Sequence, residues 1–235
     1  MTTLLLRLAG PLQAWGDSSR FTQRQTRREP TRSGIIGMLA SARGLRRTEA
    51  LEEFVALEFA VRVDQPGTVV RDFHTAIRWQ TGESMPLSNR YYLQDAVFVA
   101  GIAGDSSLVN GLAAAVRRPR WAPYLGRRSC PPSRPVFMGV VDVEVRDAVR
   151  DARWQASEWY QDDCARRGGE AVLTIRADAH PGERGSETVR DVPQSFDPRR
   201  RQHGWREVVD LEPRRIALRP ESKRDPDFFA TVQGG

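Results

Sequence analysis

The chain has 235 residues, of which 40% are hydrophobic and 28% are charged, so it can bury a substantial core in one or two domains. Its formal net charge of +6 favours an anionic partner, with nucleic acid as the first candidate. Its two cysteines are far apart and no apolar run approaches ~18 residues, which argues against a disulfide framework or a membrane span and predicts a soluble, cytoplasmic protein.

Hydrophobic periodicity predicts six principal elements in residues 1–147. In chain order they are a strand at 2–9, a helix ending near 43, strands at 58–63 and 96–103, a helix from about 106 to 118, and a strand at 136–145. The order β-α-β-β-α-β is typical of the ferredoxin-like arrangement, which RNA-recognition modules also use. We therefore predict an α+β fold with a ferredoxin-like (RRM-like) domain at 1–147.

The segment between the second and third predicted strands indicates a projecting β-hairpin at about 71–95. Two strand-like stretches flank a polar centre at 78–87, which contains Gly82 and Pro86. Its apolar content is too low for a core element. Beyond Asp147 the pattern weakens, and strands near 170–177, 188–196 and 204–211 predict a β-rich C-terminal extension at 148–213 packed on the first domain. We expect 214–235 to be a flexible tail.

Residues 24–37, R-Q-T-R-R-E-P-T-R-S-G-I-I-G, place several arginines at the entrance to the first predicted helix. Thr31 or Ser33 can cap that helix. A helix N-terminus and planar guanidinium groups both suit a phosphate. Gly34 and Gly37 share one helix face, which favours close approach of another backbone, either RNA or a neighbouring strand. The alternative for the whole segment is a solvated basic turn before an ordinary helix.

Basic residues also alternate with aromatic ones along the chain, as in proteins whose arginines hold phosphates while rings stack on bases. For each aromatic residue the alternative is packing in the core. Our RNA-binding candidates are Trp15, Arg20, Arg24, Arg27, Thr31, Arg32, Ser33, Gly34, Gly37, His74, Arg78, Arg90, Tyr91, Arg127 and Arg128.

No catalytic constellation is evident in the sequence. It contains no phosphate-binding or dinucleotide-binding glycine motif, no HExxH and no carboxylate set at metal spacing, so we predict no cofactor, no metal and no enzymatic activity. A lone histidine in a strand, such as His74, is usually a structural hydrogen-bonding group. The alternative is that His74 acts as the general base of a metal-independent endoribonuclease, assisted by Tyr91 or Tyr92.

Four segments together carry a family resemblance: L-R-L-A-G-P-L-Q-A-W-G at 6–16, P-T-R-S-G-I-I-G at 30–37, R-D-F-H-T-A at 71–76 and P-Y-L-G-R-R-S-C-P at 123–131. With them the chain resembles the CasD family of the RAMP superfamily, subunits of type I-E CRISPR Cascade complexes. After about Asp147 the resemblance is limited to R-D-V-P-Q-S-F at 190–196.

The resemblance implies a ferredoxin-like palm with a β-hairpin thumb. It also implies a non-catalytic subunit that grips the 5′ handle of the crRNA and contacts the CasC backbone, the large subunit CasA and other Cascade subunits in antiviral defence. Residues 30–34 would fall on the handle-binding palm and 71–95 on the thumb. Relatives in type I-C systems cut the CRISPR repeat, which keeps the endoribonuclease with His74 open as an alternative. A generic basic DNA-binding protein is a third possibility.

Overall fold

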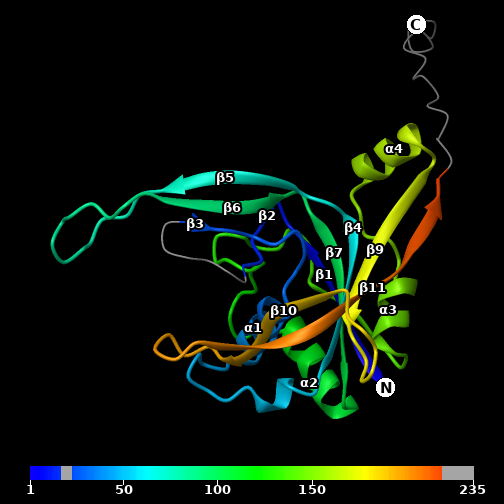
Figure 1. Cartoon of the computed structure of the whole chain (residues 1–235), viewed down its shortest axis with the longest axis horizontal. Helices are drawn as coiled ribbons and strands as arrows, with labels where there is room; N and C mark the ends of the chain where they lie inside the picture. The colour runs from blue at the N-terminus through cyan, green and yellow to red at the C-terminus, as the bar shows by residue number, and fades with distance from the viewer. Residues whose placement is uncertain (17–22, 219–235) are drawn as a thin grey trace, which may run out of the picture.

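The computed structural model describes residues 1–16 and 23–218. Its main feature is a seven-stranded antiparallel sheet with the order β10-β11-β9-β4-β7-β1-β8 (Figure 1). The strands are β1 (Thr2–Ala9), β4 (Glu58–Gln65), β7 (Val97–Gly104), β8 (Phe137–Val141), β9 (Glu170–Asp178), β10 (Glu187–Ser195) and β11 (Gln202–Ala217). The fold is therefore mixed, with a large antiparallel sheet and few helices.

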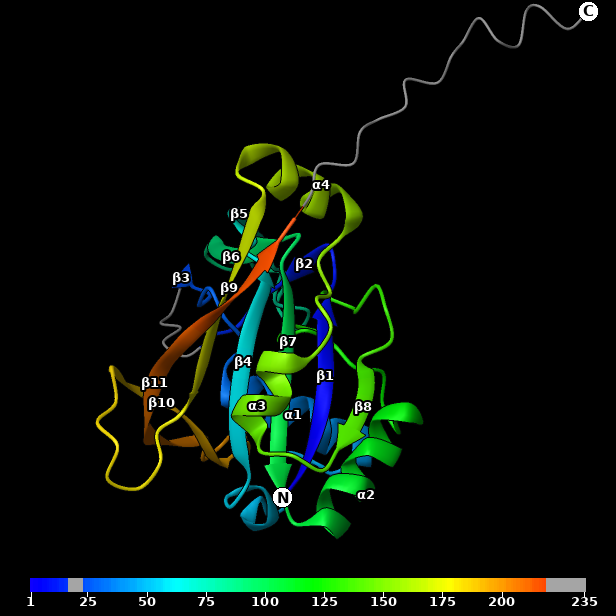
Figure 2. The same cartoon turned by 90° about the vertical axis from the view of Figure 1, so that its right-hand side faces the viewer.

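Helices cover both faces of this sheet, which is why β1 is apolar in consecutive positions. Leu4, Leu6 and Leu8 point to the face that carries α1 (Arg32–Arg43) and α2 (Ser106–Arg117). Leu5 points to the other face and packs with Val149 of α3 (Val145–Asp151). Figure 2 shows α3 in front of β4 and β7, with α1 behind the sheet.

The four strands and two helices predicted in the first part of the chain are present, with one difference at the end. The fourth predicted strand was placed at 136–145, whereas β8 ends at Val141 and residues 145–151 form α3. Of the residues that extend the predicted strand, Val143 lies in the bend between these two elements and Val145 begins the helix. Val145 is buried against the sheet as part of a helix rather than a strand.

The predicted hairpin is formed by β5 (Thr68–His74) and β6 (Ser88–Gln94) and projects from the sheet in Figure 1. It begins a few residues earlier than the predicted 71–95. Two short strands, β2 (Leu12–Gln13) and β3 (Gln23–Arg24), also pair with β6. The thumb, defined here as residues 68–94, is thus joined to the chain that enters α1.

The C-terminal strands continue the same sheet. β9 pairs with β4, and β11 pairs with both β9 and β10, while α4 (Glu158–Arg167) packs near β9. Residues 214–217 belong to β11, with Arg214 opposite Leu173, so the flexible tail predicted from 214 begins too early. Most of that predicted tail, 219–235, lies outside the described residues.

Within the described ranges, no helix combines the length and the apolar character needed to cross a membrane.

Candidate nucleic-acid interface

The N-terminus of α1 is buried and already bound by a carboxylate of the protein. Thr31 is the N-cap, and its Oγ1 accepts a hydrogen bond from the Gly34 backbone N–H at 3.2 Å. The backbone N–H of Arg32 donates to Oδ2 of Asp191 at 2.7 Å. Thr31 and Ser33 are both buried. Asp191 therefore takes the position that we predicted for a phosphate, and the structure places Thr31, Arg32 and Ser33 in the interior rather than on an exposed surface.

The side chain of Arg32 is part of the same buried network. Its guanidinium forms an ion pair with Asp178 at 3.0 Å and donates to the carbonyls of Leu57 at 2.6 Å and Val55 at 2.9 Å. Arg206 then joins Asp178 to Asp191. Burial lowers the pKa of the Arg32 guanidinium, with Asp178 acting in the opposite direction. Arg32 thus fastens α1 to the C-terminal strands.

Arg27 has a similar partner in the C-terminal extension. Its Nη2 lies 2.6 Å from Oε1 of Glu187, and the hydrogen bond from Arg27 holds the pKa of that carboxyl below its usual value. Arg176 binds Glu187 from the other side at 2.8 Å. The Arg27 side chain is 26% exposed, so it is held by protein charges rather than presented freely to solvent.

Trp15 explains one of the two glycines in α1. Its ring is 1% exposed, and its Nε1 donates to Oε1 of Gln13 at 3.1 Å. A Cβ on Gly34 would lie 2.8 Å from the Trp15 ring. The close approach predicted at Gly34 is therefore made by an indole ring, and Trp15 is packed in the core, which is the alternative stated for each aromatic residue. At Gly37 the ring of Phe196 is at ordinary contact distance, 3.5 Å from the Cβ position.

A basic surface does exist at the base of the thumb, made by Arg24, Arg90 and Arg127. The register of β3 and β6 places Arg24 beside Arg90. Nη2 of Arg127 donates to the backbone carbonyl of Arg24 at 2.8 Å, and its guanidinium lies 4.6 Å from the centroid of the Tyr92 ring. We call Arg24, Arg90 and Arg127 the thumb-base cluster.

Two guanidinium nitrogens of the thumb-base cluster lack protein acceptors. Nε of Arg90 and Nη1 of Arg127 are both inaccessible to solvent, and neither has a hydrogen-bond partner. A buried donor without an acceptor costs about 1–3 kcal/mol, so a movement of these side chains that let an incoming acceptor reach the two nitrogens would be favoured. Among the described residues these arginines form no ion pair with a carboxylate, which leaves their charge available to a phosphate.

The pleat of the hairpin sorts the remaining thumb candidates onto two faces. Direct pairing of Asp72 with Arg90 and of His74 with Ser88 places His74 on the face that carries Arg90 and Tyr92. Nε2 of His74 lies 2.9 Å from Asp72 and 3.4 Å from the Tyr92 hydroxyl. Tyr91 is on the opposite face with Arg71, so it does not join this group.

Three further RNA-binding candidates, Arg128, Arg78 and Arg20, are not joined to the thumb-base cluster by any described side-chain contact. Arg128 follows Arg127 and is exposed. Arg78 is exposed in the outer part of the thumb and pairs with Glu83 at 3.0 Å. Arg20 falls in 17–22, outside the described residues.

The loop that presents Arg127 is fixed to the segment after β1. The backbone N–H of Ala14 donates to the carbonyl of Leu125 at 3.1 Å, and Leu125 is fully buried. Gly126 has φ of +82°, and a Cβ there would overlap the carbonyl oxygen of Ala14. Only glycine fits this turn, which directs Arg127 toward Tyr92 and Arg24.

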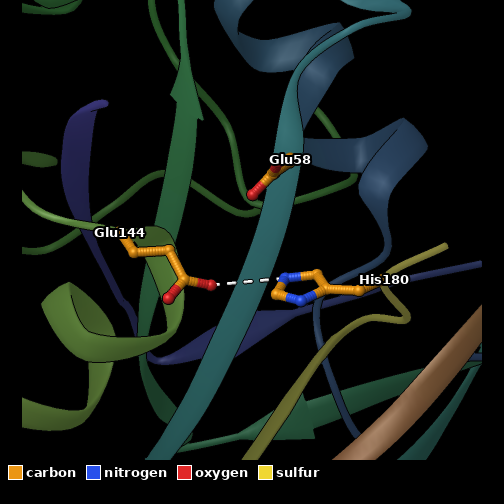
Figure 3. Close-up of side chains that lie close together, drawn as sticks. All are labelled: Glu58, Glu144 and His180. Carbon is orange, nitrogen blue, oxygen red and sulfur yellow. Dashed lines mark ion pairs between the residues drawn. The ribbon is translucent and has the colours of Figure 1, made fainter. Parts of the chain in front are cut away.

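A second group of polar side chains comes from three separate elements. Glu58 at the start of β4, Glu144 before α3 and His180 after β9 place one ligand-type atom each within 4.8 Å of one another (Figure 3). The sequence analysis missed this group because its members are far apart in the chain. His180 pairs with Glu144 at 3.3 Å, and this ion pair between two partly exposed residues accounts for the grouping.

Comparisons with known proteins show which family the chain belongs to. A family model described as CRISPR-associated protein (Cas_Cas5) matches residues 3–209. The chain belongs to this Cas5 family. The CRISPR system Cascade subunit CasD of Escherichia coli (strain K12) is 39% identical over a 158-residue alignment that covers 58% of this chain and 70% of that protein.

Two solved structures of CRISPR-associated proteins are similar to the chain along most of its length. A chain of a CRISPR RNA-guided surveillance complex is 32% identical with a TM-score of 0.69, and the match covers 92% of this chain and 91% of that chain. A crystal structure of a Cas protein is 33% identical with a TM-score of 0.65, and covers 93% and 96%. The resemblance to CasD predicted from four sequence segments is confirmed.

Proposed function

We propose that this Cas5-family protein is a non-catalytic RNA-binding subunit of a type I-E CRISPR Cascade surveillance complex in the cytoplasm. In this proposal the thumb-base cluster grips the 5′ handle of the crRNA. The observation that carries it is the pair of buried guanidinium nitrogens without acceptors, on Arg90 and Arg127, where β6 of the thumb lies beside β3 and the loop of Arg127. Relatives named as a Cascade subunit and as part of an RNA-guided surveillance complex support the setting.

The order β4-β7-β1-β8, with α1 and α2 on one face, supports a ferredoxin-like palm in this proposal. The thumb supports contact with the CasC backbone, because Phe73, Ile77 and Trp79 are 67%, 69% and 87% exposed. We expect CasA to contact the same end of the complex.

The first test compares handle binding by the Arg90→Ala/Arg127→Ala variant with the unsubstituted protein. Each lost phosphate contact should reduce the slope of log K against log salt concentration by roughly 0.7 on a single strand. The two substitutions together should therefore make this salt slope shallower by about 1.4. The handle affinity should fall by roughly 10-fold or more, since hydrogen bonds to charged groups contribute about 1.5–3 kcal/mol. Fluorescence anisotropy over a salt series gives both quantities.

The matched control is Arg46→Ala/Arg47→Ala, which removes the same charge from an exposed loop. It should leave the slope and the affinity nearly unchanged. An equal loss in both variants would mean that only net charge matters. Unrelated duplex DNA should compete poorly, and effective competition would instead favour generic DNA binding.

The endoribonuclease alternative has one observation in its favour, the Asp72–His74–Tyr92 contacts. Two features oppose it. Tyr92 is only 3% exposed and so is poorly placed to donate a proton to a leaving oxygen, and Tyr91 lies on the other face of the hairpin.

We therefore expect no cleavage when the pure protein is incubated with its cognate repeat RNA in EDTA. Products should be absent from denaturing gels for both the unsubstituted protein and His74→Ala. Cleavage that disappears in His74→Ala would establish the enzyme and refute the non-catalytic proposal.

A further inference from the structure

A second basic surface lies on the hairpin of β10 and β11, apart from the elements that form the thumb. It consists of Arg190, Arg199, Arg200, Arg201 and Trp205, all of which are exposed. In Figure 1 the turn between β10 and β11 extends toward the same side of the molecule as the thumb. We call these five residues the distal hairpin surface.

The charge of this surface is not neutralised by neighbouring carboxylates. Within the described residues, none of its four arginines forms an ion pair. Asp191 is buried and bound by Arg206. Asp197 is occupied in shaping the turn, where its Oδ1 accepts the backbone N–H of Arg199 at 2.9 Å. The arginines at 199–201 are therefore free to meet phosphates.

Trp205 adds a stacking surface beside these charges. It is 65% exposed and lies near the start of β11, at the register shift between the Gly204 and Arg206 pairings. The Arg190 guanidinium lies 5.8 Å from its ring centroid and is held in place by a hydrogen bond from Nε to the carbonyl of His203 at 3.2 Å. Exposed aromatic rings flanked by arginines are typical of proteins that bind single-stranded nucleic acid, because bases of any sequence can stack on them.

We propose that the distal hairpin surface is a second single-strand site, which holds RNA that continues beyond the segment bound at the thumb-base cluster. Its position relative to the handle rests on the proposed function. Arg199, Arg200 and Arg201 bind phosphates, and Trp205 stacks on one base. The two sites together give the protein a longer footprint on RNA than the thumb base alone.

The experiment uses the full chain and three RNAs: the handle alone, the handle extended by a single-stranded tail of ~20 nucleotides, and oligouridine of the same total length as the extended RNA. The two longer RNAs are long enough to contact both surfaces at once. Arg199→Ala/Arg200→Ala should bind the extended RNA roughly 10-fold more weakly, with a slope shallower by about 1.4. Its affinity for the handle alone should stay within about twofold. Arg46→Ala/Arg47→Ala, with the same charge change, should match the unsubstituted protein on all three RNAs.

Substitution of Trp205 tests base stacking separately from charge, because it leaves the net charge of the protein unchanged. Trp205→Ala should weaken binding of the extended RNA by roughly 5-fold or more without changing the salt slope, whereas Trp205→Phe should keep most of the affinity. Because these side chains are exposed, all variants should unfold at the temperature of the unsubstituted protein.

Three results would overturn the inference. The first is extended-RNA binding that is unchanged in both Arg199→Ala/Arg200→Ala and Trp205→Ala. The second is a tail that adds no affinity to the handle. The third is weakened assembly with other Cascade subunits while RNA binding is unaffected, which would assign the surface to a protein. Failure of the proposed function looks different: the handle alone would not bind, while oligouridine binding would still depend on Arg199, Arg200 and Trp205.

Discussion

Arg32→Ala should lower the free energy of unfolding by about 3 kcal/mol. The Arg32 side chain is 9% exposed and neutralises Asp178 while it satisfies the carbonyls of Val55 and Leu57. Removing one partner of a buried ion pair costs about 3–5 kcal/mol, because the other charge stays buried. The lower end applies here, since Asp178 keeps its second partner, Arg206. Urea unfolding followed by circular dichroism measures the change.

Arg28→Ala is the matched control, because Arg28 lies in the same basic segment but is exposed. Its free energy of unfolding should stay within about 0.5 kcal/mol of the unsubstituted value. Folded Arg32→Ala protein should keep the salt slope of handle binding. If instead Arg32→Ala is fully stable and its slope is shallower, Arg32 contacts phosphate and its structural role is refuted.

Most elements in the first part of the fold could be predicted from the sequence, because the alternation of apolar residues in strands and their helical spacing are local signals. β1, β4 and β7 and the two long helices follow from them. Burial of a charged residue is different, since it depends on partners far along the chain. Arg32 meets Asp178 and Asp191 only after β9 and β10 join the sheet, so an arginine count could not separate Arg32 from Arg24.

The candidate site could be predicted only in part, because it also depends on contacts between residues far apart in the chain. Arg24, Arg90 and Arg127 come together because β3 pairs with β6 and the loop at 123–131 returns to residue 14. The segment resemblance pointed to both regions but did not distinguish residues that hold the scaffold from residues that face outward. Trp15 and Gly34 show this clearly, because both lie in matching segments and they pack against each other.

Gly126→Ala should lower the free energy of unfolding by roughly 3 kcal/mol or more. Its φ of +82° costs an L-residue about 1–2 kcal/mol, and the added Cβ would overlap the backbone oxygen of Ala14, a residue whose N–H donates to the carbonyl of Leu125 in the same loop. Relief requires the loop to move away from Ala14. Thermal and urea unfolding measure the loss.

The same substitution should also weaken handle binding in protein that remains folded, because moving the loop separates Arg127 from Arg24 and Tyr92. Gly111→Ala is the control: Gly111 lies within α2, nothing approaches its Cβ position, and the change should stabilise the protein by up to about 1 kcal/mol. A Gly126→Ala protein with normal stability would show that the turn adapts freely. One that is destabilised yet binds the handle normally would show that the position of Arg127 does not determine RNA affinity. Loss of both properties together would tie the geometry of this one turn to the RNA-binding surface.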